Sequence, residues 1–85
     1  MPKTIALVED DAAIRDNYIV ALKNQGYQVN AYKDRPSASD AFADTLPDLA
    51  IIDIGLVDEI EGGFVLCQQL RQLSPTLPII FFTAR

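Results

Sequence analysis

Acidic side chains follow two of the apolar runs in this 85-residue sequence. Glu9 and Asp10 come directly after an apolar run at 5–8, and Asp53 directly follows another at 49–52. Carboxylates that lie close together repel one another and raise one another's pKa unless a cation lies among them. Oxygen ligands with room for water suit Mg²⁺ or Mn²⁺, held by one or two carboxylates and a phosphate group. The pattern therefore predicts an acidic metal site.

A third apolar run, at 79–82, is followed by the hydroxyl of Thr83. On the same rim, this hydroxyl could donate to a phosphoryl oxygen, and the small Ala84 beside it would leave the approach to Asp53 open. A simpler interpretation is that acids after strands cap helices, which accounts for Asp11, and that Thr83 is an ordinary hydroxyl at a strand end. Two acidic strand ends and a third polar one together favour the site.

The apolar runs predict the strands that position these residues. The runs at 5–8, 49–52 and 79–82 are continuous, as is typical of parallel strands with helices on both faces. Residues 27–32 alternate instead, so we predict a strand at the edge of the sheet. Ligands of open parallel sheets bind outside the carboxyl ends of the strands. Neighbouring first and third strands would therefore bring the acids into one cleft.

Three helical patterns separate the predicted strands. The first follows Asp11, a good N-cap residue, and is stopped by Gly26. The second has Pro36 in its first turn, and Pro47 marks its end. The third opens at Gly62 and has a predicted buried stripe made of Phe64, Cys67, Leu70 and Leu73. The resulting order, β-α-β-α-β-α-β, predicts a parallel sheet with right-handed crossovers.

Composition narrows the classes of function. Twelve acidic and seven basic residues give a net charge of −5, which disfavours direct contact with nucleic acid because phosphate backbones bind clustered Lys and Arg. The lone Cys67 excludes an internal disulfide framework and fits a reducing compartment. The first apolar run, at 5–8, is too short for a signal peptide or a membrane span. We therefore expect a cytoplasmic protein with no membrane contact.

The sequence resembles the receiver domain of bacterial two-component response regulators over essentially its whole length. The resemblance rests on residues 5–15, on Asp53 after its apolar run, on residues 82–84, and on the spacing between the acids and from Asp53 to Thr83. It implies an α/β, flavodoxin-like (CheY-like) doubly wound parallel sheet with strand order 2-1-3-4.

The resemblance also implies roles. Asp53 matches the phosphoacceptor, which takes a phosphoryl group from the phosphohistidine of a sensor histidine kinase or from a small donor. Glu9, Asp10 and Asp53 match the acids of the Mg²⁺ or Mn²⁺ site, with Glu9 acting largely through water, and the carbonyl of Gly55 matches the backbone ligand. Thr83 matches the switch hydroxyl. Such a module is a signalling phosphoacceptor and not an enzyme beyond its own phosphotransfer and dephosphorylation, and it controls an output, commonly transcription.

Three departures from the family pattern stand out, the third being a consequence of the second. The loop 55–63 is longer and more acidic than usual, lacks proline, and resembles that of response regulators of proteobacterial dedicated sortase systems. The sequence also reaches Arg85 before the fifth strand and the lysine that follows it, and one such fixed cation can be worth ~2–4 kcal/mol to the transferred group. We therefore expect residues 1–85 to form a partial receiver domain that lacks the C-terminal helix–strand–helix portion. Its bare fourth strand, 77–82, is expected to mediate a homodimer.

Three other functions compete with this interpretation. A phosphatase of the haloacid dehalogenase class also uses an aspartate after a parallel strand, but it needs a second acid two residues later, where this sequence has Gly55. A module that keeps the fold for interaction alone, without phosphorylation, is the main alternative. A flavin or nucleotide binder is disfavoured because no glycine-rich loop follows the first strand.

Overall fold

The computed structural model describes residues 2–53 and 62–82. Strands and helices alternate along these residues, as the sequence predicts. The elements are β1 (Thr4–Val8), α1 (Ala12–Asn24), β2 (Gln28–Tyr32), α2 (Arg35–Asp44), β3 (Leu49–Asp53), α3 (Gly62–Leu73) and β4 (Ile79–Phe82).

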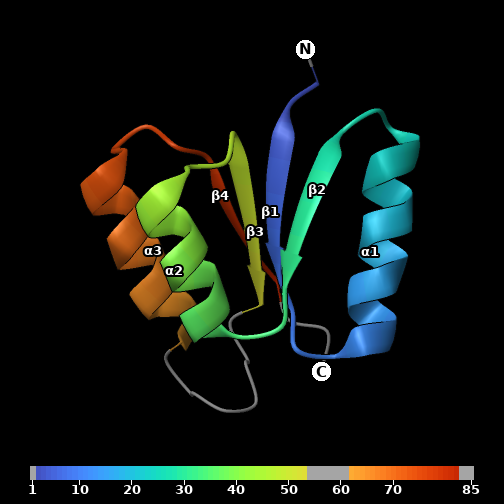
Figure 1. Ribbon diagram of the computed structural model, residues 1–85, viewed down its shortest axis with the longest axis horizontal. Coiled ribbons are helices and arrows are strands. Elements are labelled where there is room, and N and C mark those ends of the chain that lie inside the picture. Colours follow the sequence, from blue (N-terminus) through green and yellow to red (C-terminus); the bar gives the residue numbers. More distant parts are fainter. Residues whose placement is uncertain (1, 54–61, 83–85) are drawn as a thin grey trace.

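The four strands form one parallel sheet in the order β2-β1-β3-β4. Helix α1 covers one face of the sheet, and α2 and α3 cover the other (Figure 1). The chain therefore makes a three-layer sandwich, in which the crossovers leave β1 and β3 in opposite directions. This arrangement confirms the predicted flavodoxin-like sheet with strand order 2-1-3-4.

The two central strands, β1 and β3, contribute side chains to a hydrophobic core on each face of the sheet. On the face of α2 and α3, the core consists of Ala6, Val8, Ala38, Phe42, Ala50, Ile52, Leu66, Leu70 and Leu77. On the face of α1, Ile5, Leu7 and Ile51 are buried beneath Tyr18, Ile19 and Leu22. Burial on both faces explains why the central strands are continuous apolar runs.

Local hydrogen bonds fix where the first two helices begin. Asp11 caps α1, its Oδ1 accepting from the backbone N–H of Ile14 at 3.1 Å. Asp34 caps α2 in the same way, accepting from the N–H of Ser37 at 2.9 Å. Hydrogen bonds from the side chain and then the backbone of Ser37 hold the pKa of Asp34 below its usual value. Past the end of α1, Gly26 has a φ of +93°, which glycine adopts without strain.

The predicted buried stripe of α3 is confirmed at Leu70 and wrong at Leu73, and the side chain of Phe64 lies outside what the structure describes. Leu66 and Leu70 are fully buried, whereas Leu73 is 49 % exposed and Cys67 is half-buried. The sequence has four consecutive apolar residues at 64–67, so more than one helical stripe fits its pattern. The packing of α3 against α2 and the sheet selects the stripe that contains Leu66 and Leu70.

The two outer strands of the sheet differ from the central ones. Strand β2 is only partly buried, in agreement with its alternating sequence. Strand β4 exposes large apolar side chains, with Ile80 at 49 % and Phe81 at 38 % exposure. Within the residues that the structure describes, none of the helices has the length and apolar character that a membrane crossing needs.

Candidate metal centre

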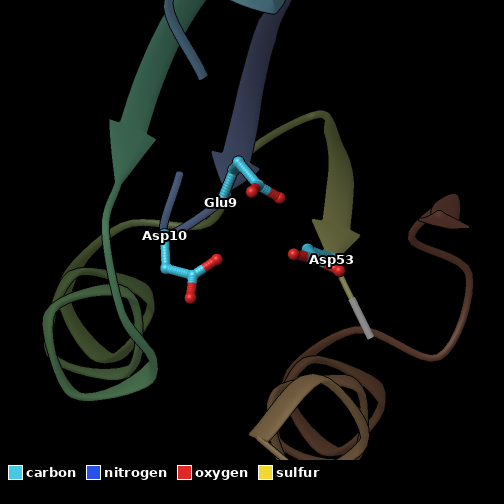
Figure 2. Close-up of side chains that lie close together, drawn as sticks. All are labelled: Glu9, Asp10 and Asp53. Atoms are coloured by element: carbon cyan, nitrogen blue, oxygen red, sulfur yellow. The ribbon is translucent and has the colours of Figure 1, made fainter. Parts of the chain in front are cut away.

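The pairing of β1 with β3 brings the acidic residues together. Val8 pairs with Ile52 in the parallel register of these strands. Glu9 follows Val8, and Asp53 is the last residue of β3, so the two carboxylates leave the sheet at the same edge. Figure 2 shows Glu9, Asp10 and Asp53 pointing toward one another from the ends of the two strands.

These three residues, here called the acidic triad, form a compact set of possible metal ligands. Each offers a carboxylate oxygen, and the three oxygens all lie within 4.8 Å of one another. Glu9 and Asp53 have no exposed surface, whereas Asp10 is partly exposed. Three carboxylates at this separation repel strongly where water is scarce. An all-oxygen set of this kind fits a hard divalent cation such as Mg²⁺ or Mn²⁺.

Hydrogen bonds hold the turn that carries two of the triad residues. We call residues 9–11 the acidic turn. The backbone N–H of Glu9 donates to the carbonyl of Tyr32 in β2 at 3.0 Å. The N–H of Asp11 donates to Glu9 Oε1 at 3.0 Å, and Arg15 Nη1 donates to the carbonyl of Glu9 at 3.0 Å. The turn is therefore tied to both its flanking helix and the neighbouring strand.

The structure brings the three predicted triad residues together. It does not test the other predicted site residues. Two of them, Gly55 and Thr83, lie outside the described residues, as do residues 55–61 of the predicted loop 55–63. Phe82 pairs with Asp53 across β4 and β3, so the described part of β4 ends at the same edge as the triad. The roles of Gly55 and Thr83 therefore stay predictions.

Sequence reasoning missed the supporting contacts of Arg15 and Tyr32. Arg15 is one helical turn beyond the cap residue Asp11, a spacing that could have suggested a side chain reaching back to the turn. The contact from Glu9 to the Tyr32 carbonyl could not have been found in this way, because a backbone acceptor leaves no trace in residue type.

A separate cavity of about 370 Å³ lies between β2 and the end of α2. Tyr32 and Phe42 contribute its aromatic walls, their ring centroids 5.8 Å apart. Burial raises the pKa of the Tyr32 phenol, which favours its neutral form. None of the triad residues lines this cavity.

Comparison with known proteins places this fold and triad in one family. The response regulator receiver domain family matches residues 5–85. Transcriptional regulatory protein CreB of Escherichia coli (strain K12) is 39 % identical over 83 residues, which are 98 % of this chain and 35 % of that protein. Virulence transcriptional regulatory protein PhoP of Salmonella typhimurium (strain 14028s / SGSC 2262) is 38 % identical over 81 residues, with 95 % of this chain and 35 % of that protein covered. The chain thus spans about a third of the length of these curated relatives.

Solved structures agree with the sequence relatives. The non-phosphorylated HemR receiver domain of Leptospira biflexa superposes with a TM-score of 0.86 at 29 % identity, over all of this chain and 66 % of that one. NtrX of Brucella abortus gives a TM-score of 0.84 at 30 % identity, over 95 % of this chain and 18 % of that one. By sequence, fold and the similarity of these relatives, the chain belongs to the response regulator receiver domain family.

Proposed function

We propose that this chain is the phosphoacceptor module of a two-component response regulator, with Asp53 as the acceptor. The observation that carries the proposal is the acidic triad, whose three carboxylate oxygens lie within 4.8 Å of one another where β1 and β3 end. Membership in the receiver family supports the same assignment. The partner that supplies the phosphoryl group is a sensor histidine kinase.

The proposed reaction is a direct transfer to the Asp53 carboxylate. One carboxylate oxygen attacks the phosphorus of a phosphohistidine, a P–O bond forms, and the P–N bond breaks. The histidine nitrogen leaves with the electron pair and takes up a proton, so the product is an acyl phosphate on Asp53. A divalent cation bound at the triad would supply charge neutralisation for the carboxylates and the phosphoryl oxygens. Transfer of this kind depends on positioning and electrostatics more than on covalent help from the protein.

The remaining roles follow from the resemblance. Glu9, Asp10 and Asp53 would hold Mg²⁺ or Mn²⁺ together with the carbonyl of Gly55, and Thr83 would donate its hydroxyl to the phosphoryl group. By the same resemblance, Glu9 would act on the cation largely through water. The names of the relatives CreB and PhoP support an output in transcription for the full-length protein.

Phosphorylation with a small donor tests the proposal. The chain is incubated with acetyl phosphate and Mg²⁺, and its intact mass is measured before and after hydroxylamine, which cleaves acyl phosphates. We expect one added phosphoryl group that hydroxylamine removes, that a chelator prevents, and that Asp53→Asn abolishes. The matched control is Asp44→Asn, which removes an exposed carboxylate in the last turn of α2 and should leave the adduct intact.

Two results would contradict the proposal. An adduct that persists in Asp53→Asn would place the acceptor elsewhere. No adduct on the wild-type chain would favour the competing function, interaction through the receiver fold without phosphorylation.

A further inference from the structure

Arg15 is a basic residue of α1 that hydrogen-bonds to the acidic turn. Its Nη1 donates to the carbonyl oxygen of Glu9 at 3.0 Å, and the contact is partly buried. We propose that Arg15 is a positioning residue of the metal centre, which orients Glu9 and Asp10 for a divalent cation. This inference rests on one part of the proposed function, the binding of a divalent cation by the acidic triad.

The geometric reason lies in the peptide group that Arg15 holds. The Glu9 carbonyl belongs to the planar peptide that joins Glu9 to Asp10, so fixing its oxygen limits ψ of Glu9 and φ of Asp10 together. These two torsions set the directions in which the two carboxylates leave the backbone. A guanidinium donor makes a charge-assisted hydrogen bond, which is stronger than one between neutral groups.

The neighbouring peptides are held by other contacts. The peptide before Glu9 donates its N–H to the Tyr32 carbonyl, and the peptide after Asp10 donates its N–H to Glu9 Oε1. Three consecutive peptide planes are thereby fixed. The middle plane, between the two acids, is held by the charged side chain of Arg15 from α1. Removing that side chain should release the plane that both acids share.

Charge and positioning make opposite predictions for this arginine. A positive charge beside the triad repels an incoming cation, so a purely electrostatic role means that neutralising Arg15 tightens Mg²⁺ binding. A positioning role means that neutralising it weakens the binding. Outer-shell residues of this kind commonly contribute 10- to 100-fold to metal affinity. The sign of the change therefore separates the two roles.

Calorimetric titration of the chain with Mg²⁺, in the absence of any phosphodonor, tests the inference. Arg15→Met keeps the aliphatic stem and removes both the donor and the charge. We expect its Mg²⁺ affinity to fall by about 10-fold, and we expect Arg15→Lys to recover part of the loss. The control Lys23→Met removes a positive charge from the last turn of the same helix and should leave the affinity within about twofold of wild type, since exposed distant charges are screened.

A second measurement needs no metal. Hydrogen exchange of the Asp11 N–H, which donates to Glu9 Oε1, should be faster in Arg15→Met than in wild type at equal global stability. If Arg15→Met does not fold, Arg15→Gln, which loses the same charge and is too short to reach, takes its place in both measurements.

Mg²⁺ binding that is unchanged or tighter in Arg15→Met would overturn the inference. An unchanged rate of hydrogen exchange at the Asp11 N–H would do the same. So would a wild-type chain that binds no Mg²⁺. The phosphorylation experiment separates this failure from that of the proposed function. If the wild-type chain forms a phosphoryl adduct on Asp53 and Arg15→Met binds Mg²⁺ as tightly as wild type, only the role of Arg15 is contradicted. If Arg15→Met binds Mg²⁺ more weakly but the wild-type chain takes no phosphoryl group, only the phosphoacceptor function is contradicted.

Discussion

Thr4 and Asp48 bind each other through two reciprocal hydrogen bonds at the start of β1 and β3. The N–H of Thr4 donates to Asp48 Oδ2 at 2.8 Å, and the N–H of Asp48 donates to the carbonyl of Thr4 at 2.8 Å. This pair is one position before the paired residues Ile5 and Leu49. The pair therefore helps to fix the register between β1 and β3, which brings the acidic triad together at the other end of these strands.

The first prediction concerns this pair. Asp48→Ala removes the side-chain acceptor and should lower the free energy of unfolding by about 1 kcal/mol, since the hydrogen bond is solvent-exposed. Urea denaturation measures the change. Asp48→Asn keeps an oxygen that can accept from the Thr4 N–H and should recover most of the stability. Equal stability of wild type and Asp48→Ala would show that the backbone pairing alone sets the register.

The second prediction concerns repulsion within the acidic triad. Without divalent cations, Asp53→Asn should be more stable than wild type by about 1–3 kcal/mol, because it removes one of three crowded carboxylates. Mg²⁺ should raise the unfolding temperature of wild type by binding to the folded state. It should raise that of Asp53→Asn much less.

Thermal unfolding with and without Mg²⁺ checks both statements. Asp44→Asn, on α2, makes the same chemical change at an exposed site and should respond to Mg²⁺ as wild type does. A wild-type chain whose unfolding temperature is the same with Mg²⁺ and with a chelator would contradict the metal centre.

The third prediction is a dependence of stability on pH through the N-cap of α2. The pKa of Asp34 is lowered in the folded state by the hydrogen bonds from Ser37. A carboxyl with a depressed folded-state pKa stabilises the fold above its unfolded-state pKa, near 3.8, and this contribution is lost as the pH falls through the folded-state pKa. Asp34→Asn keeps a capping side chain that does not titrate.

Urea denaturation of both proteins between about pH 5 and pH 2 tests this dependence. Wild type should lose stability relative to Asp34→Asn as the pH falls. Parallel pH profiles of the two proteins would show that the cap does not contribute through the charge of Asp34.

The fourth prediction concerns the outer strand β4. In the 85-residue chain, this strand presents Ile80 and Phe81 at the sheet edge, and exposed apolar edge strands pair with other chains. We expect the chain to self-associate at micromolar concentration and Ile80→Lys to shift it toward monomer, as measured by sedimentation velocity. The control is Val20→Lys, at a residue of α1 that is 59 % exposed. It should leave the degree of self-association as in wild type. A wild-type chain that sediments as a monomer would refute the prediction.

The sequence alone determined the order of elements and the identity of the acids. Continuous apolar runs predicted the central strands because a strand buried on both faces has no polar side. Asp11 and Gly26 predicted the limits of α1 because capping and left-handed backbone are local properties of residue type. The same locality made Glu9, Asp10 and Asp53 visible as acids that directly follow strands.

Tertiary structure decided what depends on contacts between distant segments. The phase of α3, with Leu66 and Leu70 buried, was set by packing because several stripes fit its apolar residues. The distance among the triad oxygens follows from the register of β1 against β3, which no single segment encodes. The spacing of Arg15 from Asp11 is compatible with a side chain that reaches back to the turn, but only the structure shows that it donates to the Glu9 carbonyl, since a backbone acceptor has no residue type. Residue types therefore identified the acids, and the strand pairing brought them together.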